Sequence, residues 1–204
     1  MSGTCLIISG GEFDSYIPAP ADYCIACDKG YEYALKLGIA PDIVIGDLDS
    51  VTISVPADIK TIKLPTVKDD TDTSCAVKHA LSIGFNDITI ICALGGRMDH
   101  FYSNTQTLCA AARQGASVRI MSTDCVMHAI CGSSLSLPQR EGWAFSVFSS
   151  SDVCRGVTIT GAAYSVSNID MYNSYPLGQS NEWASGMAEI SCAEGTLLVI
   201  ESKI

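Results

Sequence analysis

Positive charge is scarce in this 204-residue chain, which has 12 Lys and Arg against 22 Asp and Glu and a formal net charge of −10. A protein that binds nucleic acid through the phosphate backbone needs a cationic face, so a general nucleic-acid binder is excluded. Charged residues make up only 17% of the chain, whereas 48% is hydrophobic. This balance excludes intrinsic disorder. It predicts a globular fold with surplus apolar surface, which an oligomer interface would bury.

Long apolar runs are also missing. The run at residues 88–94 is far shorter than the roughly 20 residues of a membrane span, and the N-terminus lacks the basic segment of a signal peptide. Cys24 and Cys27 form a CxxC without the second pair that a zinc site needs, so we interpret both as buried core cysteines. The ten cysteines indicate a reducing compartment, and we expect a cytoplasmic protein that does not bind membranes.

Strand and helix signals alternate over the first part of the chain. Apolar runs predict strands at residues 5–9, 23–27, 43–45, 88–94 and 117–121. Helical patterns occur at residues 31–37, 73–83 and 99–113. This alternation predicts an α/β domain with a parallel sheet. After Asp124 only short β-rich pieces punctuated by glycine follow, which is typical of an all-β sandwich or barrel. They lie at residues 126–130, 143–148, 157–160, 187–192 and 196–201. We therefore expect two domains, residues 1–124 and residues 125–204.

Acidic residues recur in the first domain where expected strands end or helices begin. They are Asp28, Asp47, Asp49, Asp69, Asp70, Asp72 and Asp99. Loops at the carboxyl ends of parallel strands gather at one edge of the sheet, so many of these carboxylates should converge. Close carboxylates repel by several kcal/mol at an effective dielectric of about 20, so convergence requires cations. Oxygen ligands favour Mg²⁺ held jointly with phosphate oxygens.

Two of the acidic segments each allow two interpretations. Gly46-Asp47-Leu48-Asp49-Ser50 is a DxD motif, and on extended chain both carboxylates would face one way with Leu48 pointing into the fold. It can hold a metal ion, or it can be a turn with solvated side chains. The segment at residues 68–72 (Lys-Asp-Asp-Thr-Asp) precedes a predicted helix. It can cap that helix, or it can supply metal ligands with a lysine for phosphate.

The third segment, Gly95-Gly96-Arg97-Met98-Asp99-His100, joins an expected buried strand to a helix. Its glycines would let a phosphate approach backbone N–H groups near the helix N-terminus, and Arg97 could clamp phosphate oxygens. The alternative is a tight turn with Asp99 as the helix cap. His100 lies beside this candidate site, but the sequence favours a structural or peripheral role for it.

Together and in this order, these segments resemble the thiamine pyrophosphokinase family. The resemblance is carried by residues 27–30, 41–50, 68–72, 95–100, 178–182 and 195–199. It implies a Rossmann-like catalytic domain followed by a β-sandwich domain. It also implies transfer of a pyrophosphoryl group from ATP to the hydroxyl of thiamine, giving thiamine diphosphate and AMP. Further implications are Mg²⁺ and a homodimer with sites where the catalytic domain of one subunit meets the β domain of the other.

The resemblance also implies roles for individual residues. Asp47, Asp49 and Asp72 would hold Mg²⁺ with the ATP phosphates, and Asp72 is also a candidate to accept the hydroxyl proton. The other implied site residues are Asp28 and Asp99 lining the same cleft, Lys68 and Arg97 on phosphate, Thr71 beside the thiamine hydroxyl, and Ser180 and Asn181 bonded to the aminopyrimidine.

Two positions depart from the family pattern. Lys29 stands where a small residue is usual, and Leu198-Val199 stands where some members stack an aromatic ring, a role that Trp183 could take instead. Two other functions stay open. The DxD motif also fits a nucleotide-sugar transferase, which would release a nucleoside diphosphate. Lys29 suggests a thiamine-diphosphate sensor, which would bind ligand without forming AMP.

Overall fold

The computed structural model describes residues 3–49, 51–67 and 69–204. Over these residues the helices are α1 (Gly30–Lys36), α2 (Asp72–Ser82) and α3 (Met98–Ala112). The strands are β1 (Thr4–Ile8), β2 (Tyr23–Cys27), β3 (Ile43–Gly46), β4 (Lys60–Lys63), β5 (Asp87–Ile91), β6 (Ser117–Met121), β7 (Cys125–Cys131), β8 (Ser134–Pro138), β9 (Trp143–Ser149), β10 (Val153–Thr160), β11 (Val166–Tyr172), β12 (Gly178–Asn181), β13 (Met187–Ser191) and β14 (Thr196–Lys203). The described chain is therefore mostly β-structure.

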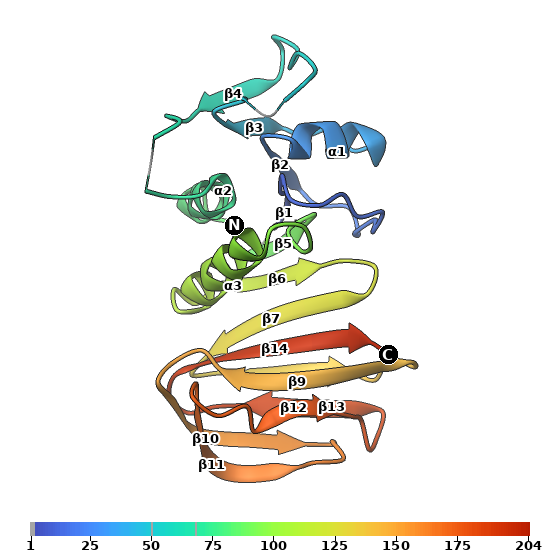
Figure 1. The fold of residues 1–204 in the computed structure, drawn as a ribbon, viewed down its shortest axis with the longest axis vertical. Coiled ribbons are helices and arrows are strands. Elements are labelled where there is room, and N and C mark those ends of the chain that lie inside the picture. Colours follow the sequence, from blue (N-terminus) through green and yellow to red (C-terminus); the bar gives the residue numbers. More distant parts are fainter. Residues whose placement is uncertain (1–2, 50, 68) are drawn as a thin grey trace. The chain divides into compact units, whose positions relative to one another are not determined.

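The strands form two sheets (Figure 1). One sheet has ten strands in the order β12-β9-β14-β7-β6-β5-β1-β2-β3-β4, and the other has four in the order β11-β10-β13-β8. The prediction of a Rossmann-like α/β domain followed by an all-β sandwich is wrong. The larger sheet is mixed and takes strands from both expected domains, and the described residues form only three helices.

The physical reason lies in connections that local patterns do not specify. The described residues between β1 and β2, and those between β3 and β4, form no helix, so loops make these two connections between parallel strands. An edge strand also offers a row of unpaired backbone groups to any later strand. The glycine-punctuated strands β7, β14 and β9 continue the sheet that β6 would otherwise end. The alternation of strand and helix signals in the sequence identifies strands, but it does not show which strands pair with one another.

The chain divides into two compact units, the first made of residues 1–111 with 116–123 and the second of residues 112–115 with 124–204. In the first unit, β4-β3-β2-β1-β5-β6 are all parallel. Helix α1 packs Tyr33 and Ala34 against Leu6, Ile8 and Cys24, whereas α2 and α3 cover the opposite face (Figure 1). Because both faces are covered, the inner strands β1, β2, β3 and β5 are almost continuously buried. Chain order reverses between β1 and β5, which is where open sheets form ligand crevices.

In the second unit, side chains from both sheets share one core. Phe145, Val147 and Leu197 come from the larger sheet, and Val157 and Ile190 come from the smaller one.

Trp183 packs its ring against Phe145, with ring centroids 4.9 Å apart, and donates from Nε1 to the carbonyl oxygen of Leu137 at 2.9 Å. This tryptophan is therefore a partly buried residue that packs against the core of the unit.

All ten cysteines are free thiols. Cys24 and Cys27 are buried, as interpreted from the sequence. Within the described ranges, none of the helices has the length and apolar character needed to cross a membrane.

Candidate functional site

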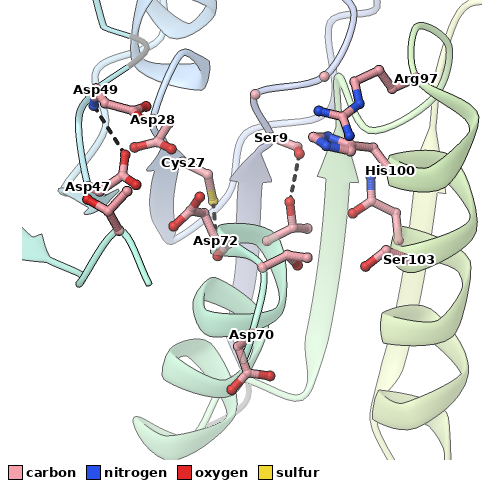
Figure 2. Close-up of a pocket in the computed structure, with 16 residues that line it drawn as sticks. Ser9, Cys27, Asp28, Asp47, Asp49, Asp70, Asp72, Arg97, His100 and Ser103 are labelled. Atoms are coloured by element: carbon pink, nitrogen blue, oxygen red, sulfur yellow. Dashed lines mark hydrogen bonds between the residues drawn. The ribbon is translucent and has the colours of Figure 1, made fainter. Parts of the chain in front are cut away.

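A pocket of about 610 Å³ opens where parallel strands of the first unit end. Ser9 follows β1, Asp28 follows β2 and Asp47 follows β3, so the sheet edge itself brings these side chains together. Figure 2 shows Asp28, Asp47 and Asp49 on one side of the pocket and Arg97 and His100 on the other. The pocket is thus acidic on one side, with cationic and neutral polar groups on the other.

Three carboxylates form the acidic side. One oxygen from each of Asp28, Asp47 and Asp49 lies within 4.8 Å of the others. The DxD segment is not extended, because Leu48 has a φ of 65° and the N–H of Asp49 donates to Asp47 Oδ1 at 3.2 Å. Leu48 points inward as expected and packs on the core formed around Tyr31. The turn, rather than strand alternation, makes the two carboxylates converge.

Asp28 is a carboxyl group of the pocket whose pKa is strongly raised. Burial, and then the neighbouring carboxyls of Asp72 and Asp47, raise its pKa to about 7, against a lowering contribution from the Leu48 N–H. That N–H donates to Asp28 Oδ1 at 3.0 Å. Gly46 faces the Asp28 carboxyl so closely that a Cβ at this position would overlap it. The site therefore holds a carboxyl group in a position where its charge is unfavourable without a cation.

Residues of the segment before α2 serve two different functions, helix capping and formation of the pocket. Thr71 is the N-cap, and its Oγ1 accepts from the N–H of Ser74 at 3.1 Å. Asp70 accepts from Lys78 Nζ at 2.7 Å, which holds the pKa of Asp70 below its usual range. Asp72, in the first turn, interacts with Asp28. Capping and site formation therefore both occur, on different residues. Lys68 lies outside the described residues.

The loop after β5 carries Arg97 on the pocket wall. Gly95 and Gly96 have φ values of 78° and 64°, which favour glycine. The N–H of Gly96 donates to Glu12 Oε2 at 2.8 Å. Arg97 makes two hydrogen bonds to Asp99, from Nε at 3.1 Å and from Nη2 at 2.5 Å. Asp99 is not among the described residues that line the pocket, so it orients Arg97 rather than facing the pocket itself.

Ser180 and Asn181 line a different cavity, of about 490 Å³, in the second unit. Asn181 is buried, and its amide bonds to backbone. Oδ1 accepts from the N–H groups of Tyr164 and Glu182, both at 3.0 Å, and Nδ2 donates to the Tyr164 carbonyl oxygen at 2.9 Å. Asn181 therefore fixes Tyr164, an aromatic residue of the same cavity. Ser180 is exposed and has a φ of 57°.

Sequence reasoning missed several polar residues of the first pocket. Ser9, Thr73 and Asn104 line it and are buried, and His100 lines it although a peripheral role was favoured. Asn104 donates from Nδ2 to the carbonyl oxygen of Ala93 at 2.8 Å. The Ser-Gly-Gly sequence that ends the first strand was the available signal for Ser9. Thr73 and Asn104 gave none, because each looks like an ordinary helix residue.

Known proteins match this chain along most of its length. A family model described as thiamin pyrophosphokinase, catalytic domain, matches residues 13–120. A thiamine pyrophosphokinase of Bacillus subtilis is 28% identical over 211 residues, which covers 98% of both proteins. A crystal structure of thiamine pyrophosphokinase from Bacillus subtilis has a TM-score of 0.87 at 26% identity, covering 98% of this chain and 99% of that one. A thiamin pyrophosphokinase family protein from Enterococcus faecalis has a TM-score of 0.82 at 25% identity and covers 100% of both chains.

These matches confirm the resemblance seen in the sequence motifs. The family model spans more than half of the 204 residues, and it includes the carboxylates of the first pocket and the Arg97 loop. The chain belongs to the thiamin pyrophosphokinase family, a family of enzymes.

Proposed function

We propose that this enzyme transfers the pyrophosphoryl group of ATP to the hydroxyl group of thiamine, giving thiamine diphosphate and AMP, with Mg²⁺ as its metal ion. Family membership supports thiamine diphosphate formation by pyrophosphoryl transfer. The observation that carries the rest is the group of Asp28, Asp47 and Asp49, with oxygens within 4.8 Å, in a pocket of about 610 Å³. Pockets of this size accept nucleotide-sized ligands.

The residues present fit a magnesium ion. Their donors are carboxylate oxygens, which Mg²⁺ prefers, and it is usually held by few carboxylates together with substrate phosphates. The raised pKa of Asp28 supports the same interpretation, because burial and its acidic neighbours make the ionised form unfavourable. We propose that Asp47 and Asp49 hold the ion with Asp28, and that Asp72 acts alongside them. When bound, Mg²⁺ supplies positive charge against the phosphate oxygens.

The chain's own residues then orient the two substrates. The thiamine hydroxyl oxygen forms a bond to the β-phosphorus of ATP as the bond from that phosphorus to the α–β bridging oxygen breaks, and AMP leaves. We assign Asp72 as acceptor of the hydroxyl proton, because it adjoins the three-carboxylate group without belonging to it. Arg97, oriented by Asp99, binds phosphate oxygens, and Thr71 lies beside the thiamine hydroxyl. Catalysis is then mainly alignment and charge neutralisation.

We assign thiamine recognition to the cavity of the second unit. Ser180 is the hydrogen-bonding candidate for the aminopyrimidine, whereas Asn181 acts by fixing Tyr164. A homodimer is part of the proposal, supported by exposed apolar side chains such as Tyr164, Tyr175 and Leu177. Sedimentation of the purified protein tests it. The ten free thiols support a cytoplasmic location.

One assay tests the reaction. Purified protein is incubated with ATP, Mg²⁺ and thiamine, and the products are separated by chromatography. Thiamine diphosphate and AMP in equal amounts are expected; ADP with thiamine monophosphate would contradict the proposal. Asp47→Asn and Asp49→Asn should each lower turnover by orders of magnitude while the fold survives. Asp58→Asn, at an exposed carboxylate on the loop before β4, is the matched control. Full turnover in both site variants would refute their metal-binding role.

A further inference from the structure

Two buried hydroxyl groups of the first pocket share one hydrogen bond. Ser9 Oγ and Thr73 Oγ1 are 2.7 Å apart (Figure 2 marks the bond from Ser9). Ser9 is 3% exposed and Thr73 is 5% exposed, yet both line the pocket. The pair joins the end of β1 to the first turn of α2, directly after Asp72. The proposed reaction gives neither residue a role.

Counting hydrogens shows that the pair is incomplete. Each hydroxyl group has one proton to donate and two lone pairs to accept with. The shared bond uses one proton, whichever residue donates it, so a second proton remains. Neither hydroxyl group makes a second hydrogen bond with the described residues. A buried donor without an acceptor is destabilising, so the second proton needs a partner from the pocket, either water or a bound ligand.

The surroundings indicate an anionic partner. Thr73 lies in the first turn of the 11-residue helix α2, where backbone N–H groups have no acceptor within the helix and the dipole favours negative charge. Gly10, next to Ser9, also lines the pocket. Arg97 lies on the pocket wall as well (Figure 2). Donors from three segments therefore face one space.

We propose that the Ser9–Thr73 hydroxyl pair donates its second proton to a non-bridging phosphate oxygen of the nucleotide. This inference rests on the proposed function, since it assumes a nucleotide in the pocket. It makes Ser9 and Thr73 binding residues for the phosphate chain. The hydroxyl pair would hold the phosphates on the side of the pocket that carries the hydrogen-bond donors. The carboxylates would hold the metal ion on the opposite side of the pocket. Thiamine, a cation, is not the partner that such donors select.

The double variant Ser9→Ala/Thr73→Val is the most direct test. It removes both hydroxyl groups together, so no buried group is left without its former partner, and it nearly keeps the shape of both side chains. The single variants each leave one hydroxyl that can still donate, so each should lose less affinity than the double variant. Thr89→Val is the matched control, because it removes a buried hydroxyl group from β5 that does not line the pocket.

Calorimetry measures the contact directly. The titrant is an ATP analogue with a methylene group between its α- and β-phosphorus atoms, in the presence of Mg²⁺, and thiamine is titrated separately. The double variant should bind the analogue about tenfold more weakly or worse, as expected for a hydrogen bond to a charged group. Its thiamine affinity should stay within twofold of wild type. Thr73→Ser, which keeps a hydroxyl group, should keep most of the analogue affinity.

Several results would overturn the assignment. Unchanged analogue affinity in the double variant would do so, and so would a loss confined to thiamine. If the double variant does not fold, Ser9→Ala/Thr73→Ala, which also removes both hydroxyl groups, takes its place, and normal analogue binding by that variant is equally decisive. Wild-type protein that neither binds the analogue nor forms product would end this assignment and the proposed function together. Wild-type product formation with normal binding by the double variant would end the assignment alone.

Discussion

Replacing Asp28 by Asn should stabilise the metal-free protein while abolishing turnover. Burial, reinforced by the nearby carboxyls of Asp72 and Asp47, raises the pKa of Asp28 to about 7. Asn has the same shape, and its side-chain oxygen can still accept the hydrogen bond from the Leu48 N–H. The φ of 46° at this position is one that Asn adopts readily. The substitution therefore removes the charge and changes little else.

The size and pH dependence of the effect follow from the pKa. In the unfolded chain the carboxyl ionises near 3.8, so folding raises its pKa and the wild-type protein loses stability as the pH rises from about 4 to about 7. The difference between these two pKa values corresponds to a loss of about 4 kcal/mol in the free energy of unfolding. We halve this to about 2 kcal/mol because Asp28 is partly exposed and solvent screens its charge. In a chain of this length, that raises Tm by roughly 4–8 °C.

Thermal unfolding in EDTA between pH 4.5 and pH 8.5 measures the difference. The Tm gain of Asp28→Asn over wild type should be small at the acidic end and reach its full size above pH 7. Asp58→Asn, at an exposed carboxylate, should show no such trend. Adding Mg²⁺ should raise the Tm of wild type more than that of the variant, because only wild type keeps the full ligand set. A variant that is no more stable than wild type at pH 8 would refute the claim that the site is electrostatically unfavourable without metal.

Three further outcomes are expected. Gly46→Ala should lower turnover at least a hundredfold, because its Cβ would displace the Asp28 carboxyl, while circular dichroism stays unchanged; normal turnover would contradict this packing. Glu12→Ala removes the acceptor of the Gly96 N–H and loosens the loop that carries Arg97. It should therefore raise the KM for ATP roughly threefold to tenfold at a nearly constant kcat. An unchanged KM would show that the contact is dispensable. EDTA should abolish product formation and Mg²⁺ should restore it, so that activity persisting in EDTA would exclude a metal-dependent reaction.

The sequence predicted the acidic side of the site because that prediction needed only strand ends and one rule of sheet geometry. Asp28 and Asp47 follow adjacent parallel strands, β2 and β3, so their convergence does not depend on the rest of the fold. The same rule could not say which acids face the pocket. Asp70 lines the pocket although it pairs with Lys78, whereas Asp99 pairs with Arg97 and does not line it. Which way an acid turns depends on the cation that lies within its reach, and local patterns do not show that.

The predicted fold class was wrong because strands that pair with one another are distant in sequence. Strands near the predicted positions are present, but four were missed: β4, β8, β11 and β12. Of these, β12 and β11 end their sheets at one side, and β4 and β8 end them at the other. Edge strands need no continuous apolar pattern, as the exposed sequence of β4 illustrates. The Ser9–Thr73 contact, between residues 64 positions apart, was equally beyond local pattern.

Backbone strain is concentrated where function is proposed. Five non-glycine residues in the described part of the chain have positive φ. Asp28 lines the first pocket and Ser180 lines the second cavity, whereas Leu48 lies between Asp47 and Asp49, and Cys92 directly follows β5. A left-handed conformation costs roughly 1–2 kcal/mol for each such residue, so the strands must hold the turns in place. The strands can do so, because Ile25, Ile43 and Ile90 are fully buried. The apolar sheet therefore holds the carboxylates in place, which is the arrangement that the proposed metal binding and preorganised electrostatic catalysis require.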